Sequence, residues 1–482
     1  MNVKQSLTVI AAVCASFMAS AEITLPSVIG NNMVLQQQSD VKLWGKATPG
    51  KDVSVKPSWC KKPVKTTVAS DSTWVVTVAT PEAGGPYSID FVEGKTKSTV
   101  DNVLIGEVWF CTGQSNMEMP LRAFDRQPLD GGNETIARAK KSTPIRMFIA
   151  DSKNGQWVRQ FSKTPKTDIQ GAWYENTPEN AAETSATAYY FAQYIQDVLD
   201  VPVGIMISSL GGSRIECWMP EDVLAKEFPK TDLSILHNDE PVKVQQRTPS
   251  ILWNAKVNPL TNYGIRGFLW YQGESNCDNA DIYDDLMAAY VRSLRDAFGG
   301  GESLPFYYVE IAPFNYDGPD KVSAALLREA QSDALDKIPN SGMASTLDIG
   351  HPVFIHPTDK ATVGQRLAWL ALANTYGIKG IASKSPRYKS HEIVDGKIYI
   401  NVENAPRGLC PMWTSLEGFE IAGEDGVFHP AFAEIETKSC RLAVSSKEVP
   451  EPKNVRYAFH NYPKMSVYSS FGLPLLPFRT DK

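Results

Sequence analysis

The stretch VLIGEVWFCTGQSNMEMP, residues 103–120, decides the fold of this chain. It begins as a near-continuous apolar run, which is typical of a strand buried on both faces of a parallel sheet. The run stops at Thr112 and Gly113, and Ser115 follows where the strand turns toward a helix. A serine at such a turn is held clear of the sheet, near backbone N–H groups that favour negative charge. Acyl transfer needs that geometry, although a serine in this position can also simply cap the helix.

The bulk composition is that of an ordinary globular protein. The chain has 482 residues, of which 43% are hydrophobic and 21% charged, and this balance supports about two to four domains with sizeable cores. The formal net charge is −6. A mildly acidic chain gives no reason to expect nucleic acid or an anionic membrane as a partner.

Residues 1–21 predict a secretory signal peptide. Lys4 precedes an apolar segment at 7–18, and Ala-Ser-Ala at 19–21 forms a small-x-small cleavage pattern. The apolar segment is too short for a resident membrane helix. We therefore expect a secreted or periplasmic protein that has no membrane partner.

Six cysteines follow the predicted signal peptide, which itself contains Cys14. An even number of cysteines in an oxidising compartment permits disulfides. Cys410 and Cys440 lie in the same late segment, and Cys217 and Cys277 each follow a glycine-containing loop. Both pairs are candidates for disulfides, and six free buried thiols are the alternative.

The mature chain divides into three regions by its pattern. In residues 22–100, short β-branched segments alternate with turn sequences, which predicts a small β-sandwich. In residues 101–380, apolar strands alternate with helical periodicities, which predicts a parallel, doubly wound α/β sheet. Residues 381–482 are turn-rich and β-like again, and predict a C-terminal β-rich domain.

Within the α/β region the apolar pattern is specific enough to place individual elements. Strands are expected at 103–111, 203–208, 267–271, 306–311 and 343–347, helices at 184–199, 283–298, 323–335 and 359–376, and long loops at 125–180 and 221–262.

Four of the predicted α/β strands end in glycines and polar residues. These endings are GQSN at 113–116, SLGGSR at 209–214, QGESN at 272–276, and DIGH at 348–351 with IHP at 355–357. Ligands bind beyond the carboxyl ends of the strands in open α/β sheets, so the four endings are candidates for one site. Four such endings on the same rim are hard to explain by turn chemistry alone.

These residue types match ester hydrolysis, which needs a nucleophile, a base and donors for the oxyanion. Ser115 supplies the nucleophile. The base is expected to be a histidine, whose unperturbed pKa is about 6.5, and His351 and His356 both follow the last strand. Gly212 can offer its backbone N–H at close range, Asn276 can offer a side-chain amide, and the N–H of Ser115 is a third possible donor.

The chain resembles the SGNH hydrolases, and more narrowly the sialate O-acetylesterase family, in the order of its motifs: GQSNM, a glycine pair, GESN and a late His-Pro. The stretches that support the narrower resemblance are 33–50, 107–120, 211–220, 267–276, 355–368, 418–431 and 472–481. The resemblance implies a flavodoxin-like SGNH domain flanked by small β domains, and removal of acetyl groups from sugar hydroxyls without a metal or other cofactor. It further implies that Ser115 is the nucleophile, that His356 is the base, and that Gly212 and Asn276 complete the oxyanion hole.

The chain departs from many SGNH enzymes at Val353, where they place an aspartate three residues before the histidine. Another group must then orient the imidazole of His356. Asp348 is the first candidate because it ends the same strand, and Glu274 and Asp359 are alternatives. Asp359 can instead cap the helix it precedes, and a backbone carbonyl would leave a Ser-His dyad.

Substrate contacts are expected from residues that flank the catalytic loops. Trp218, Trp270 and Tyr271 can stack on a sugar face or pack in the core. Arg214 can pair with the carboxylate of a sialic acid or form an ordinary salt bridge. Glu274 is a further candidate for substrate binding.

The sequence therefore predicts a secreted carbohydrate O-acetylesterase that acts on O-acetylated sialic acid by a Ser-His acyl-enzyme mechanism. The motifs determine the acetyl chemistry, while the sugar is selected by loops that carry no recognisable signal. An acetylesterase for xylan or another polysaccharide, and a non-catalytic glycan-binding protein, are the alternatives. The expected partner is an O-acetylated sugar or glycan, and the sequence makes no prediction of the oligomeric state.

Overall fold

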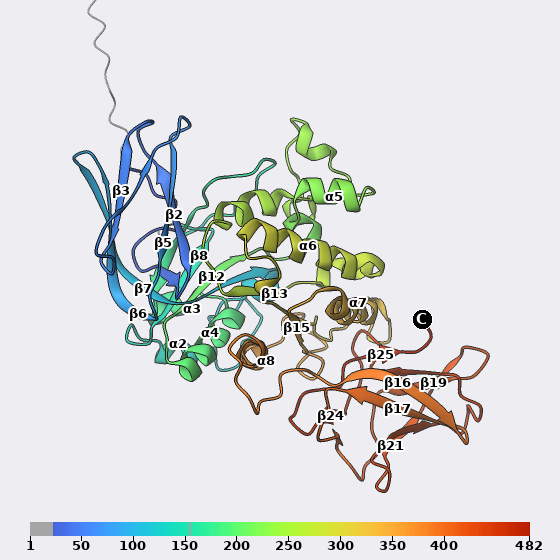
Figure 1. Cartoon of the computed structure of the whole chain (residues 1–482). Coiled ribbons are helices and arrows are strands. Elements are labelled where there is room, and N and C mark those ends of the chain that lie inside the picture. Colours follow the sequence, from blue (N-terminus) through green and yellow to red (C-terminus); the bar gives the residue numbers. More distant parts are fainter. Residues whose placement is uncertain (1–22, 154–155) are drawn as a thin grey trace, which may run out of the picture.

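A computed structural model of the protein describes residues 23–153 and 156–482 (Figure 1). The predicted signal peptide lies outside these ranges. At the centre is a sheet in which five parallel strands lie in the order β12, β7, β13, β14, β15. Their bounds are β7 Thr96–Gly113, β12 Val203–Ser209, β13 Gly267–Tyr271, β14 Phe306–Val309 and β15 Ser341–Ala344. A sixth parallel strand, β8 (Ile145–Ala150), lies beyond β12, so the six parallel strands have the chain order 2-3-1-4-5-6, and the predicted doubly wound α/β sheet is confirmed.

Helices cover both faces of this sheet, which explains why every residue of β12, β13 and β14 is buried. Helices α4 (Ala186–Leu199) and α8 (Lys360–Asn374) share one hydrophobic cluster with one face of the strands. Helices α6 (Tyr283–Phe298) and α7 (Ser323–Lys337) pack on the other face. All four helices lie within a few residues of their predicted bounds. Asp359 is the N-cap of α8, with its carboxylate accepting a hydrogen bond from the N–H of Thr362 at 2.9 Å.

The segment 125–180 is more ordered than predicted. Strand β8 (Ile145–Ala150) extends the sheet beyond β12, and β11 (Gly171–Glu175) closes that edge in the antiparallel direction. Helices α2 (Gly132–Arg138) and α3 (Pro178–Ala182) and the short pair β9 (Ser152–Lys153) and β10 (Gln156–Trp157) complete the segment. The prediction of a long loop was wrong because abundant Pro, Gly and Asn mask a single buried run, IRMFIA. In the other predicted loop, residues 221–262, helix α5 (Glu221–Glu227) is followed by short helical turns.

The N-terminal β region merges with the central sheet through strand β7 (Figure 1). The first half of β7 pairs with β6, and its second half pairs with β12 and β13. The predicted boundary at residues 100 and 101 therefore falls inside one 18-residue strand. The other strands are β1 Val34–Gln36, β2 Asp40–Lys46, β3 Asp52–Pro57, β4 Val64–Thr67, β5 Thr73–Ala79 and β6 Gly84–Glu93. Strands β2 and β5 form a separate pair that packs on the larger sheet. Trp74 of β5 contacts Phe91 of β6, and their ring centroids are 5.8 Å apart.

A buried carboxylate reinforces this junction. Glu107 of β7 is 1% exposed and accepts hydrogen bonds from Gln37 at 2.7 Å, Arg266 at 2.6 Å and Tyr376 at 2.8 Å. Burial raises the pKa of Glu107, but the hydrogen bonds and charge of Arg266 outweigh that effect and hold it below the ordinary value. The carboxylate therefore links the N-terminal region to two distant segments of the α/β region.

The C-terminal region has a hydrophobic core of its own. One antiparallel sheet contains β16 (Arg387–Val394), β17 (Lys397–Glu403), β22 (Leu442–Ser445) and β21 (Phe432–Ile435). A second contains β20 (Phe428–Pro430), β19 (Phe419–Ala422), β23 (Asn454–Tyr457) and β25 (Phe478–Arg479), and β18 (Leu409–Cys410) pairs with β24 (Tyr468–Ser469). In the hydrophobic cluster between these strands, Leu347 is the one buried residue that comes from the α/β region.

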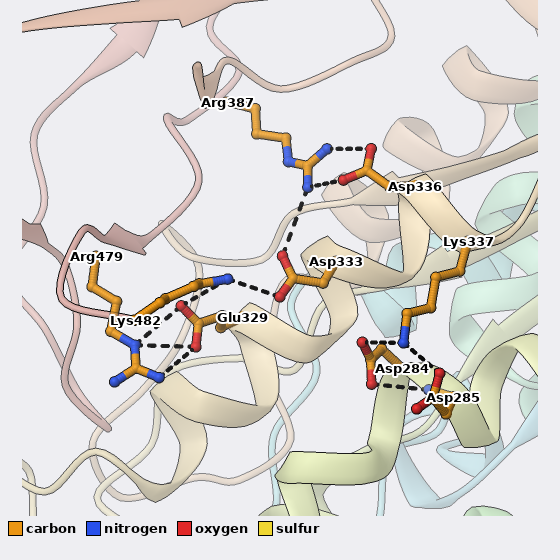
Figure 2. Close-up of polar contacts among 9 residues, drawn as sticks. All are labelled: Asp284, Asp285, Glu329, Asp333, Asp336, Lys337, Arg387, Arg479 and Lys482. Carbon is orange, nitrogen blue, oxygen red and sulfur yellow. Dashed lines mark hydrogen bonds and ion pairs between the residues drawn. The ribbon is translucent and has the colours of Figure 1, made fainter. Parts of the chain in front are cut away.

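Charged side chains on α7 join the C-terminal region to the central sheet (Figure 2). Asp336 pairs with Arg387 of β16 at 2.6 Å, and Glu329 pairs with Arg479 of β25 at 3.0 Å. Lys482 lies 2.8 Å from Asp333 and 3.3 Å from Glu329. On the far side of the same helix, Lys337 contacts Asp284 and Asp285 at the start of α6.

The cysteines of the described ranges are all free, so neither candidate disulfide is formed. They are Cys60, Cys111, Cys217, Cys277, Cys410 and Cys440. Among the described helices, none combines the length and the hydropathy that crossing a membrane requires.

Candidate active site

The serine turn begins where β7 passes close to β13. Gly113 has a φ of 142°, and a Cβ at this position would lie 2.2 Å from the carbonyl oxygen of Tyr271, so a glycine is needed. The chain then enters the single turn α1 (Ser115–Glu118), with the half-buried Ser115 as its first residue. Within the described ranges, the N–H groups of Ser115 and Asn116 have no hydrogen-bond acceptor. Two backbone donors are therefore free beside the hydroxyl of Ser115.

The glycine pair after β12 lies against this turn. The N–H of Gly211 donates to the carboxylate of Glu118, and the position that a Cβ of Gly211 would occupy lies 3.4 Å from the Cβ of Ser115. Gly212 has a φ of 71°, in the left-handed region that glycine favours, and its N–H has no acceptor in the described part of the chain. The structure thus brings Ser115 and the glycine pair together.

His356 lies in the loop before α8 and is 9% exposed. Its Nδ1 is 2.5 Å from the Oε1 of Gln127, and the ring of Phe124 packs edge-on against the imidazole at a centroid distance of 5.4 Å. An amide oxygen only accepts, so Nδ1 carries the proton and Nε2 keeps its lone pair. This is the tautomer that a general base requires.

Burial lowers the pKa of His356 to about 4, and the positive charge of Lys360 contributes to the same shift. The imidazole is therefore neutral at neutral pH. A neutral histidine can accept a proton over a wider acidic range than an exposed histidine could.

Asn116 connects the serine turn to two other segments of the rim. Its amide nitrogen donates to the carboxylate of Glu274 and, at 3.3 Å, to the carbonyl oxygen of Ile355. Its amide oxygen accepts from the ammonium of Lys360. Because Ile355 precedes His356 in the chain, these contacts hold the loop that carries the histidine beside the turn that carries Ser115.

Asp348 occupies a different place from the one predicted. Its two carboxylate oxygens each lie 2.7 Å from the guanidinium of Arg366, which is buried, whereas Asp348 is half-buried. In the C-terminal region, burial raises the pKa of Tyr468, and the charge of Asp348 adds to that shift. The group on the Nδ1 of His356 is the side-chain amide of Gln127, so the contacts do not support Asp348 as the residue that orients the base.

The second predicted histidine and Asp359 have local roles. The Nδ1 of His351 accepts hydrogen bonds from the N–H groups of Val353 and Phe354, and so stabilises its own loop. Asp359 caps α8 through Thr362. Neither contacts Ser115 or His356 in the described structure.

Asn276 is completely buried, and both of its amide hydrogens are already used. Its nitrogen donates to Glu216 at 2.9 Å and to Asn279 at 3.1 Å. Its oxygen accepts from the N–H of Ile215 at 3.1 Å and from Gln272 at 2.8 Å. This arrangement leaves no N–H for an oxyanion, and instead fixes the loop after β12 to the loop after β13.

Three of the residues expected near the substrate belong to the interior. Trp218 and Trp270 are fully buried and meet edge to face at 6.1 Å, and the indole of Trp218 donates to the hydroxyl of Ser213 at 2.9 Å. The alternative that both pack in the core therefore holds. Tyr271 is also fully buried. Glu274 differs from these three, because its carboxylate accepts a hydrogen bond from Asn116 while the half-buried residue lines the pocket that contains Arg214.

Arg214 lines an open pocket of about 530 Å³ next to the catalytic loops. Its guanidinium pairs with Asp278, while its Nε is buried and has no partner within the described residues. Arg247 lines the same pocket and donates to the carbonyl oxygen of Ser275 at 3.0 Å. Two guanidinium groups thus lie in one pocket beside the glycine pair.

Across residues 23–153 and 156–482, no cluster of three or more His, Cys, Asp or Glu side chains is suited to hold a metal ion.

Sequence reasoning missed four residues that the structure places in or around the site. They are Glu118, Gln127, Arg247 and Lys360. Glu118 and Lys360 lie inside the recognised stretches 107–120 and 355–368, so charged residues within those stretches were an available signal. Gln127 and Arg247 come from loops with no periodicity, and no local pattern marks them.

Comparison with known proteins identifies the class of enzyme. The profile of the family described as "Carbohydrate esterase, sialic acid-specific acetylesterase" matches residues 105–373. A human sialate O-acetylesterase is 29% identical over 407 residues, which cover 78% of this chain and 75% of the human protein. A mouse sialate O-acetylesterase is 29% identical over 440 residues, covering 78% of each chain. The crystal structure of a carbohydrate acetylesterase from Xanthomonas citri is 32% identical and superposes with a TM-score of 0.84, covering 95% of this chain and all of that one.

The chain is thus a carboxylic-ester hydrolase. More narrowly, it belongs to the sialic acid-specific acetylesterase family of carbohydrate esterases, and the resemblance read from its motifs is confirmed.

Proposed function

We propose that the protein is an SGNH-type serine esterase that removes acetyl groups from O-acetylated sialic acid. The observation that carries the proposal is the juxtaposition of Ser115 with free backbone N–H groups and with the segment of His356. The hydrogen bond from Asn116 to Ile355 supports that juxtaposition. Membership of the family supports the acetyl chemistry.

In the proposed mechanism, the Oγ of Ser115 attacks the acetyl carbonyl while the Nε2 of His356 takes its proton. The N–H groups of Ser115 and Gly212 stabilise the tetrahedral oxyanion. The sugar hydroxyl leaves with the proton from His356, which leaves an acetyl group on Ser115. Water then attacks this acetyl-enzyme with the same histidine as base, and acetate leaves. Gln127 holds the imidazole in the reactive tautomer, so a side-chain amide serves where many serine hydrolases use a carboxylate.

For the substrate, we propose that Arg214 and Arg247 bind the sugar carboxylate. Guanidinium groups recognise carboxylates through paired hydrogen bonds, and both arginines line one open pocket. Asp278 would have to give up its contact with Arg214, and its exposed carboxylate makes that exchange inexpensive.

Two further expectations belong to the same proposal. The signal-like segment at 1–21 favours export, with a periplasmic or secreted mature enzyme. We keep residues 22–100, 101–380 and 381–482 as the proposed domain organisation, with the first boundary lying inside strand β7, which the first two regions share.

The test is acetate release by the purified mature protein from O-acetylated sialic acid and from acetylated xylo-oligosaccharide. Ser115→Ala is the test variant, and Ser98→Ala, at the far end of the same strand, is the control. We expect preference for the sialic acid in the wild type, unchanged activity in the control, and a loss of about a thousandfold or more in Ser115→Ala. Preference for the xylan fragment would leave the proposed mechanism in place and would contradict O-acetylated sialic acid as the substrate. Release that persists in Ser115→Ala would overturn the mechanism.

A further inference from the structure

Lys360 is an unusual residue for its position. It is the first residue of α8 and is completely buried. Lysines are almost never fully buried unless they are paired, and a cation at the N-terminus of a helix opposes the helix dipole. The fold therefore retains Lys360 at a cost to stability, which suggests that its charge serves another purpose.

The ammonium of Lys360 has two direct contacts. It donates to the side-chain oxygen of Asn116, and it lies over the ring of Tyr271 at 5.2 Å from the ring centroid. Its charge is balanced at longer range by the carboxylates of Glu274 and Asp359. Burial lowers the pKa of Lys360 to about 7, and these two carboxylates oppose that shift.

The hydrogen bond from Lys360 decides how the amide of Asn116 points. Because the oxygen of that amide accepts from the ammonium, the nitrogen must face the other way, toward Glu274 and Ile355. Asn116 follows Ser115 directly, and Ile355 directly precedes His356. One side-chain amide thus links the two segments that carry the nucleophile and the base.

We infer that Lys360 is a positioning residue for the Ser115–His356 pair: it fixes the amide of Asn116 and holds a positive charge beside the imidazole. The inference rests on the proposed function of Ser115 and His356. It assigns Lys360 no contact with the substrate or with the reacting atoms.

The second part of the inference follows from the groups that face His356. Gln127 and Phe124 are uncharged, and Lys360 is the charged group that shifts its pKa. A positive neighbour disfavours the imidazolium ion, so Lys360 keeps His356 in the basic form at acid pH. The imidazole of His356 titrates at a pH where Lys360 is still protonated. The positive charge of Lys360 is therefore present over the pH range in which His356 gains its proton.

The experiment is a pH profile of kcat and of kcat/KM for Ser115-dependent acetate release between about pH 3 and 8. Lys360→Met removes the charge with little change in shape, Lys360→Arg keeps the charge, and Lys379→Met, on the exposed segment after α8, is the matched control. We expect Lys360→Met to lose about tenfold or more in kcat, because a misplaced base reacts slowly. Its acid limb should also move to higher pH by at least about half a unit, while Lys360→Arg keeps the limb of the wild type at a reduced kcat.

A structural role alone would lower the rate equally at every pH and leave the limb in place, and that result overturns the inference. NMR titration of the histidine ring protons measures the pKa of His356 without using activity. It is practical because the chain has only six histidines. An unchanged pKa of His356 in Lys360→Met would also overturn it. Lys360→Gln replaces the methionine variant if that variant does not fold. Failure of the wild type to release acetate would instead count against the proposed function, and the titration would still report on Lys360.

Discussion

The two β regions that flank the central sheet are attached to it by different forces. On the N-terminal side, β7 runs without interruption from one sheet into the other, and the apolar residues of both regions form one hydrophobic cluster. On the C-terminal side the β region encloses its own cluster. It meets α7 through ion pairs (Figure 2) and through buried contacts, because Asn461 accepts a hydrogen bond from the N–H of Ala324 at 2.8 Å and Leu476 joins the central cluster. The first attachment is made of a shared strand and a large buried area, and the second combines a few buried contacts with charges that are partly open to water.

The difference predicts how each junction responds to its surroundings. Salt screens charges that lie near the surface, with a Debye length of about 8 Å at physiological ionic strength, but it has little effect on buried contacts. The N-terminal region should therefore unfold together with the central sheet. The C-terminal region should be the one whose attachment depends on ionic strength and pH.

The largest effect is expected at the middle of β7. A Cβ on Gly106 would lie 2.0 Å from the carbonyl oxygen of Pro202, so Gly106→Val must push the strand away from its neighbour. We expect a loss of more than about 4 kcal/mol in the free energy of unfolding, seen as a poor soluble yield and a much lower Tm. Gly30→Ala, where the nearest atom is 3.8 Å away, is the control. A Gly106→Val protein as stable as the wild type would refute the shared-strand account.

The next largest effect concerns Asp348, which lies where the central sheet meets the C-terminal region. Asp348→Asn leaves the buried guanidinium of Arg366 without its counter-charge, and we expect a loss of about 3 kcal/mol in urea unfolding. The kcat per folded molecule should remain within about twofold of the wild type, because Gln127 occupies the Nδ1 of His356. A large fall in kcat at unchanged stability would restore Asp348 as the residue that orients the base.

A smaller effect is expected on α7. Glu329→Gln removes the partner of Arg479 and Lys482 while keeping the size of the side chain. Because both cations are partly exposed, we expect a loss of about 1 kcal/mol at low salt that nearly vanishes in 1 M NaCl. Glu107→Gln is the matched comparison at the other junction, and its cost should persist in salt since that carboxylate is buried. Equal salt dependence in the two variants would remove the contrast between the junctions.

The smallest effect is a pH dependence of the C-terminal junction. His460 contacts the carbonyl oxygen of Asp320 at 3.0 Å and the carboxylate of Glu420 at 2.9 Å, and the hydrogen bond with Glu420 raises the pKa of His460. The pKa of Glu420 is lowered by the same hydrogen bond.

The histidine therefore contributes stability below its unfolded pKa of about 6.5, and this contribution is lost as the pH rises through the higher folded pKa. The glutamate contributes above its unfolded pKa of about 4.3, and its contribution is lost as the pH falls through the lower folded pKa. Comparing wild type and His460→Gln in urea from pH 5 to 9, we expect a difference below about 1 kcal/mol that is largest near pH 5 to 6. A difference that does not vary with pH would show that the pair carries no charge coupling.

The elements with a strong local pattern were predictable from the sequence. The strand at Gly267–Tyr271 and the helix at Tyr283–Phe298 have the predicted bounds, because apolar periodicity and a helix-ending glycine at 299 are local properties. Strand β8 was missed because six buried residues lie among turn-formers. The continuity of β7 was missed because pairing with two sheets is a non-local property, and its alternating first half resembles an ordinary edge of a sandwich.

The rim of the site was predictable for a similar reason, and its hydrogen bonds were not. Strand endings placed Ser115 and Gly212 at one edge, since the carboxyl ends of parallel strands share it. Which partner each polar side chain selects depends on distances between segments far apart in the chain. Asp348 meets Arg366, and His356 meets Gln127 from a loop more than two hundred residues earlier, so neither contact has a local signature.

Strand β7 also constrains how the gene can recombine. A crossover within codons 96–113 would join half a strand from one parent to half from another, and both halves would have to match the sheets they pair with. A crossover near codon 380 asks less of the partners, because it falls between α8 and β16 and divides no strand; a newly acquired C-terminal module has to match the charges on α7 and a few buried contacts such as that of Asn461. Exchange of the C-terminal module should therefore be the easier route by which relatives diverge, with the N-terminal module inherited together with the catalytic sheet.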